Sequence, residues 1–161
     1  MLRQNRKNQA FTLVEILIVV VILGILAAVV IPRFANASKD AKRAALSSQL
    51  NQVRAQIQLY TIEHGDQRPP NLAGNNWTDL INPSVYNGTN RGPYLPNIPV
   101  NTLNGFTNIA VVVADPSWGD AVVGANIGFV YNSANGFMYG TSALGDKVFN
   151  ESNANDPAND Q

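Results

Sequence analysis

The sequence predicts an α+β protein in which one long N-terminal helix packs on a small C-terminal antiparallel β-sheet. From Phe11 to Ile31, 18 of 21 residues are apolar, and farther along the chain apolar residues recur at spacings of three and four. Both patterns are typical of helices. Beyond residue 65, glycine, asparagine and proline cluster around short β-branched runs, a pattern that indicates strands joined by turns.

The first half of the predicted helix, residues 11–31, is long enough to cross a membrane. At about 1.5 Å per residue it spans roughly 31 Å, close to the hydrocarbon core of a bilayer. Basic residues precede it at positions 3, 6 and 7, and Glu15 is its only charged residue. Under the positive-inside bias, the N-terminus is cytoplasmic and the residues after Ile31 lie across the membrane.

Glu15 is the unusual residue of this segment. An ionised carboxylate near the membrane centre costs about 2.5–3.5 kcal/mol unless it is paired, so we expect a functional role and a partner. The alternative is a secretory signal peptide cleaved between Ala37 and Ser38, after an Ala-Asn-Ala sequence, which would release a soluble domain. The apolar run is long for such a peptide, and a discarded leader has no need of Glu15.

The helix is expected to continue as an amphipathic half over residues 32–64. Gly24 and Pro32 are candidate kink positions, although Pro32 could instead end the membrane segment. One apolar stripe follows at helical spacing: Leu46, Leu50, Val53, Ile57 and Tyr60. Lys39, Lys42 and Arg43 are expected on a solvated face, with lipid headgroups or a neighbouring subunit as other possible contacts. His64 is expected to cap the helix or face solvent, and Gly65 to end it.

Residues 65–150 are predicted to form the globular domain. A short helix or turn is expected around 77–81, strands at 109–114, 127–131 and 137–140, and a hairpin turn between the last two. Residues 151–161 are polar and contain no aromatic residue, so this tail is expected to be disordered.

Composition excludes several classes of function. The chain has no cysteine, a single histidine, and eleven basic against eleven acidic residues. A disulfide framework, a thiolate site and a multi-histidine metal site are therefore excluded within one chain. The neutral total argues against a general nucleic-acid binder. No nucleophile elbow or phosphate-binding loop occurs in the sequence, and we do not expect an enzyme.

The sequence from Arg6 to Glu15, RKNQAFTLVE, followed by an unbroken apolar helix, resembles the prepilin signature of type IV pilins and type II secretion pseudopilins. The resemblance implies residues 1–10 as a leader, cleavage between Ala10 and Phe11 by a prepilin peptidase, and N-methylation of Phe11. The family usually has glycine at the position of Ala10, and alanine is the smallest substitute. In a filament, Glu15 would neutralise the Phe11 amine of a neighbouring subunit and fix the axial register. Its alternative role is to stabilise the positive end of its own helix.

A second stretch, GPYL at 92–95 followed by IPVN at 98–101, resembles the major pseudopilin of type II secretion. The resemblance implies a subunit of a pseudopilus in the bacterial inner membrane, with a periplasmic head. The implied partners are other copies, other pseudopilins, the prepilin peptidase and an inner-membrane assembly platform, and not nucleic acid. A type IV pilin for adhesion or motility is the alternative. The family's calcium loop corresponds here to residues 140–151, where Asp146 and Glu151 are weak candidate ligands and paired aspartates are missing.

Overall fold

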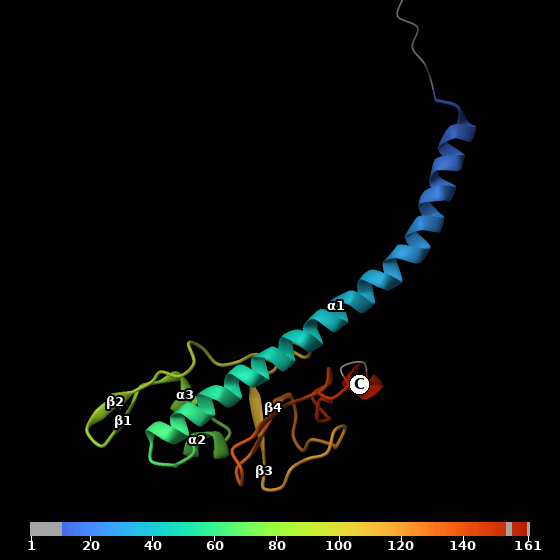
Figure 1. Cartoon of the computed structure of the whole chain (residues 1–161). Coiled ribbons are helices and arrows are strands. Elements are labelled where there is room, and N and C mark those ends of the chain that lie inside the picture. The colour runs from blue at the N-terminus through green and yellow to red at the C-terminus, as the bar shows by residue number, and fades with distance from the viewer. Residues whose placement is uncertain (1–10, 154–155, 161) are drawn as a thin grey trace, which may run out of the picture. The chain divides into compact units, whose positions relative to one another are not determined.

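The computed structural model describes residues 11–153 and 156–160. The elements are α1 (Leu13–Glu63), α2 (Pro70–Ala73), α3 (Thr78–Ile81), β1 (Ser84–Tyr86), β2 (Thr89–Arg91), β3 (Asn108–Val112), β4 (Ile127–Asn132), β5 (Met138–Gly140) and the 3-10 helix η1 (Pro157–Asp160) (Figure 1). The chain divides into two compact units between Ser38 and Lys39. We call the second unit the head.

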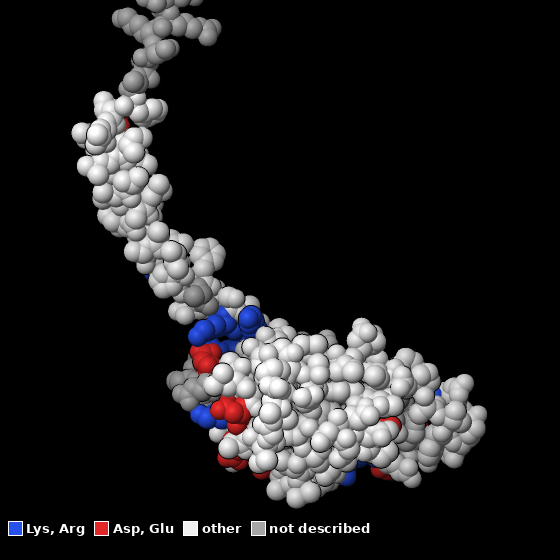
Figure 2. Space-filling view, turned by 180° about the vertical axis from the view of Figure 1, so that it is seen from behind, with Lys and Arg blue, Asp and Glu red and all other residues white. Residues whose placement is uncertain are grey.

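In the first unit, the described residues include the exposed apolar part of α1. Residues 11–34 are all exposed, and an 18-residue window of this segment has a mean hydropathy of 3.3. Its surface is almost free of charge (Figure 2). Among the described residues, α1 is the one helix long and apolar enough to cross a membrane. Pro32 lies inside α1 and does not end it; the predicted kinks at Gly24 and Pro32 remain predictions.

In the head, the predicted stripe of α1 forms the core. Its five residues are at most 6% exposed, because their spacing of three and four places them on one helix face. They belong to one cluster with residues from α3, β4 and β5, among them Leu80, Phe129 and Met138. The predicted turn around 77–81 is α3, where Trp77 and Leu80 are buried.

The end of α1 differs in part from the prediction. Gly65 has a φ of +63°, as a left-handed helix stop requires. His64, however, is buried rather than facing solvent, with its ring stacked on Tyr60 at 3.8 Å between centroids. Its Nδ1–H donates to the Tyr60 carbonyl at 2.9 Å, and Nε2 lies 2.8 Å from Ser84 Oγ. The ring therefore caps the helix from inside the core.

The main sheet has the order β3-β4-β5. The β4–β5 pair is antiparallel, as the hairpin prediction requires. The β3–β4 pair is parallel, so the sheet is mixed and the expectation of an all-antiparallel sheet is wrong. The 14 residues between β3 and β4 are long enough for this arrangement, because a parallel pair needs a crossover of about a dozen residues or more. The α+β class itself is confirmed.

A second sheet, β1–β2, was not anticipated. Its strands are antiparallel and joined by Asn87 and Gly88, with φ values of +49° and +75°. Two successive residues with positive φ are typical of a type I′ hairpin turn, for which Asn-Gly is a preferred sequence. The sequence had indicated a turn here, but the flanking residues are too polar to predict strands.

The loop after β2 is fixed to α1 and to the sheet by side chains of the 92–107 stretch. Tyr94 Oη donates to Glu63 Oε2 at 2.7 Å, near the end of α1. Asn101 is fully buried, and its Nδ2 donates to the carbonyls of Gly128 and Thr141. These contacts give the stretch a structural role, because each satisfies a polar group inside the head.

The described residues of the tail, 151–153 and 156–160, also differ from the expectation of disorder. Residues 157–160 form η1, and Asn159 is fully buried. A polar segment lacks an apolar surface to bury, but asparagine and aspartate can order it through hydrogen bonds and ion pairs. The described part of this segment is ordered in that way.

Candidate functional site

The first turn of α1 is closed by a reciprocal pair of side chains. Glu15 Oε2 accepts hydrogen bonds from the backbone N–H of Thr12 at 2.8 Å and from Thr12 Oγ1 at 2.7 Å. In return, Thr12 Oγ1 accepts from the backbone N–H of Glu15 at 3.2 Å. This is a capping box, in which two side chains satisfy backbone donors that a helix start leaves without partners.

This cap is absent from the expectations for Glu15, which were a role in a filament or an effect on the helix dipole. The signal was nevertheless present, because Thr12-x-x-Glu15 before an apolar run is the sequence pattern of a capping box. Glu15 therefore has a structural task in its own subunit, whatever else it contacts.

Around this cap the surface is apolar. Phe11 precedes Thr12 and is 81% exposed, while Leu13, Val14 and Ile16 follow and are also exposed. A single carboxylate on an exposed apolar helix favours a partner that is apolar and carries one positive charge. Ala10 lies outside the described residues, so cleavage after it and methylation of Phe11 remain predictions.

The candidate calcium ligands are each engaged by another side chain. Glu151 forms a two-pronged ion pair with Arg54, at 2.5 Å and 2.8 Å. Asp146 Oδ1 accepts from Ser142 Oγ at 3.0 Å. Among the described residues, no three His, Cys, Asp or Glu side chains gather as a metal site would need. Calcium requires six to eight oxygen ligands, and a guanidinium beside Glu151 repels a cation. These two residues do not fit a calcium site.

Of the basic residues that begin the head, Lys39 and Lys42 are exposed as expected, whereas Arg43 is buried. The Arg43 side chain is 7% exposed and pairs with Asp40 and Asp160. Lys39 pairs with Asp160 at 3.1 Å, and Lys42 is exposed. The sequence could not predict the pairing, because Asp160 is 117 residues from Arg43.

Asp115 lies between β3 and β4 and accepts hydrogen bonds from three side chains. Its Oδ1 accepts hydrogen bonds from Asn132, Asn135 and the Tyr139 hydroxyl, all between 2.6 and 2.8 Å. These bonds, first that of Tyr139, lower the pKa of Asp115. Burial and the hydrogen bond to Asp115 raise the pKa of Tyr139 to about 12. The carboxylate thus ties the crossover segment to β4 and β5.

Comparison with known proteins finds similarity at the N-terminal part of the chain. A family model described as a prokaryotic N-terminal methylation motif matches residues 5–31. The type II secretion system core protein G of Pseudomonas aeruginosa is 38% identical over 61 residues, which are 38% of this chain and 43% of that protein. The ComG operon protein 3 homolog of Bacillus licheniformis is 32% identical over 66 residues, 41% of this chain and 67% of that protein.

A third relative is the major component of the type IV narrow pilus of Thermus thermophilus, 36% identical over 57 residues, 35% of this chain and 49% of that protein. The chain thus spans less than half the length of the Pseudomonas protein that it matches. No solved structure matches the chain.

Proposed function

The chain belongs to the pilin and pseudopilin family, and we propose that it is a structural subunit of a type II secretion pseudopilus, polymerised through α1. Membership of this family favours a structural rather than a catalytic protein, anchored in the inner membrane by an apolar N-terminal helix. The type II system is favoured over other pilin systems by the similarity to a core protein G. The absence of cysteine from the sequence, and with it of a disulfide-closed C-terminal region, also favours it.

One observation carries the proposal: residues 13–31 form an apolar helix that is exposed along its whole length and has a single carboxylate in its first turn. Apolar surface of this extent is unstable in water and must be covered by lipid or by other apolar helices. In the membrane, lipid tails cover it. In a filament, the same helices of neighbouring subunits replace the lipid.

Glu15 gives the assembly its register in this proposal. Cleavage after Ala10 leaves a protonated amine on Phe11, and an apolar filament core would bury that charge at a high cost unless it is paired. Glu15 of the adjacent subunit supplies the opposite charge. Since each subunit carries one such carboxylate on the helix, the axial offsets that bring the two charges together are favoured over the others.

The proposed insertion, processing and assembly of the subunit follow from its apolar N-terminal helix. It is inserted in the inner membrane with a cytoplasmic N-terminus and a periplasmic head, cut and methylated by the prepilin peptidase, and assembled by the inner-membrane platform with a cytoplasmic ATPase. Its mechanism is mechanical, because growth of the filament pushes periplasmic substrates toward the outer membrane.

Mass spectrometry of the mature N-terminus tests the proposal. We expect a mature chain that begins with methylated Phe11 and sediments with membranes when it is expressed with a prepilin peptidase. Ala10→Gly should be processed at least as fast, and Ala10→Leu should remain uncut because the site requires a small residue. A mature chain that begins at Ser38 and is soluble would overturn the proposal.

A type IV pilin is the second candidate, favoured by the similarity to a pilus component of Thermus thermophilus. The two functions predict different phenotypes for a strain that lacks the subunit. Loss of a pseudopilin leaves secreted enzymes in the periplasm, whereas loss of a pilin removes filaments that can be sheared from the cell surface.

A further inference from the structure

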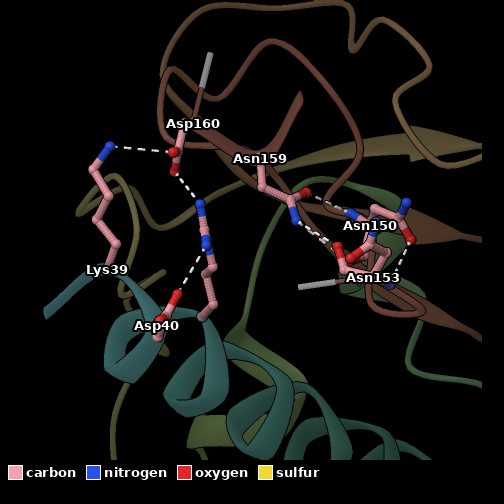
Figure 3. A network of polar contacts seen from close by, with 7 residues as sticks. Lys39, Asp40, Asn150, Asn153, Asn159 and Asp160 are labelled. Carbon is pink, nitrogen blue, oxygen red and sulfur yellow. Dashed lines mark hydrogen bonds and ion pairs between the residues drawn. The ribbon is translucent and has the colours of Figure 1, made fainter. Parts of the chain in front are cut away.

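The last described turn of the chain is fastened to the beginning of the head. We call the fastening residues the clamp: Lys39, Asp40, Arg43, Asn150, Asn153, Asn159 and Asp160 (Figure 3). We propose that this clamp, and not a calcium ion, holds the chain after β5 in place, so that the head is stable without metal.

The first part of the clamp is a charge network. Asp160 lies between two cations of α1, with Oδ2 at 3.1 Å from Lys39 Nζ and Oδ1 at 2.7 Å from Arg43 Nη2. Arg43 also reaches Asp40, at 3.0 Å from Nη1. The guanidinium is almost completely buried, and a buried charge that loses a partner is strongly destabilising. The ion pair between Asp160 and Arg43 therefore contributes more to the stability of the head than a surface ion pair would.

The second part is a set of hydrogen bonds around Asn159, which is fully buried. The Asn159 Oδ1 accepts a hydrogen bond from the backbone N–H of Asn150 at 2.7 Å. The backbone carbonyl of Asn159 accepts one from the backbone N–H of Ala143 at 3.0 Å. The side-chain amide of Asn159 makes further bonds. Its Nδ2 donates to the carbonyls of Asn153 and Asn150, at 3.2 and 3.4 Å. The Asn159 side chain thereby binds three backbone groups, the N–H and carbonyl of Asn150 and the carbonyl of Asn153.

Two side-chain oxygens that a cation could use here already accept hydrogen bonds. Asn150 Oδ1 accepts from the backbone N–H groups of Ser152 and Asn153, and Asp156 Oδ2 accepts from Asn150 Nδ2. Glu151 faces the guanidinium of Arg54. Calcium would have to displace these donors and approach a positive charge. Asn150 and Glu151, at the end of the stretch that the family resemblance gave to the metal, thus belong to a network of amide and arginine contacts.

Thermal unfolding of the full chain in detergent micelles, followed by circular dichroism of the head, tests the proposal. We expect the same Tm, within about 1 °C, in 5 mM EGTA and in 5 mM calcium chloride. This arm uses the unaltered chain and does not depend on whether a variant folds. A Tm that falls by several degrees in EGTA and is restored by calcium would overturn the proposal.

Two variants and a matched control test the residues. Asp160→Asn and Asn159→Ala should each lower the Tm by several degrees, since each breaks one part of the clamp. Asp66→Asn removes a carboxylate at an exposed position outside the clamp and should change the Tm by less than about 1 °C. A Tm of Asp160→Asn equal to that of Asp66→Asn would contradict the role of the ion pairs.

Hydrogen exchange locates the effect. In Asp160→Asn, the backbone amides of Ala143 and Asn150 should exchange at least tenfold faster, while those of β4 keep their protection. Unchanged exchange at these two amides would show that Asp160 does not hold the segment, and would overturn the proposal.

Discussion

Thr12 and Glu15 hold each other across the first turn of α1, each side chain accepting a hydrogen bond from the backbone N–H of the other residue. In the proposed filament, the same carboxylate has a second role, because it also pairs with the Phe11 amine of a neighbouring subunit. The cap needs an oxygen acceptor at position 15, whereas the pairing needs a negative charge. Substitutions can separate the two tasks.

Glu15→Gln separates them most clearly. Glutamine also serves in a capping box, so this variant should keep the helix start, insert and be cleaved, but fail to assemble, because its charge is gone. Glu15→Ala should fail in the same way. Thr12→Ala, which loses about 1 kcal/mol of helix capping and keeps the charge, should still form filaments. The measurement is the sheared or cross-linked filament fraction, and normal assembly of Glu15→Gln would refute charge pairing.

Leu50→Ala should destabilise the head by about 2–5 kcal/mol, because it removes a fully buried side chain and leaves a cavity. Ile62→Ala, on the same helix but 72% exposed, is the control. Apart from the change in helix propensity, it should lower the free energy of unfolding by less than about 0.5 kcal/mol. Urea denaturation measures both. Similar losses in the two variants would contradict the burial pattern of α1.

Gly128→Ala should destabilise the head by about 3 kcal/mol or more. A Cβ at position 128 would lie 2.2 Å from the carbonyl oxygen of Phe106, which is backbone and cannot turn away. Gly74→Ala is the matched control, since its φ is −94° and its nearest contact would be 3.4 Å. The yield and Tm of the two variants check the prediction, and a Gly128→Ala chain as stable as Gly74→Ala would disprove the close approach.

The Asp115 carboxylate should make part of the stability of the head depend on pH. Its hydrogen bonds hold its pKa below the ordinary 3.8, so the folded state binds this proton less readily than the unfolded state. The contribution is then complete above the ordinary pKa and is lost as the pH falls through the lower, folded-state value.

Unfolding curves of the parent chain and of Asp115→Ala between pH 7 and pH 2 check this expectation. The difference in Tm between them should be constant down to about pH 5 and narrow below the ordinary pKa. Asp120→Ala is a control from the same loop. A difference that widens on acidification would show the opposite sign of the pKa shift.

The elements of the fold that rest on periodicity could be predicted from the sequence. The stripe from Leu46 to Tyr60 is buried as its spacing requires, and the apolar segment 13–31 is exposed as a membrane or filament helix must be. The hairpin of β4 and β5 follows from two β-branched or aromatic runs around a glycine-bearing turn. Each of these signals is local, so a single stretch of sequence contains all of it.

The features that could not be predicted depend on partners far away in the chain. Nothing in the run at 109–114 says that β3 pairs in parallel with β4, because strand direction is set by the crossover between them. Arg43 looks like any exposed arginine until Asp160 is placed beside it. The segment 151–161 has the composition of a disordered tail, and composition does not reveal that Asn159 matches the backbone groups around it. At Glu15, by contrast, the pattern of the capping box is local and is contained in the sequence.

The contact between Lys39 and Asp160 joins positions 121 residues apart, and so brings the last described turn of the chain to the residue of α1 at which the head begins. A pulling force that enters the head along α1 meets this contact first. The ion pairs of Asp160 lie where that force is applied. In a subunit that is proposed to push and to be pushed, these contacts resist the separation of the two ends of the head.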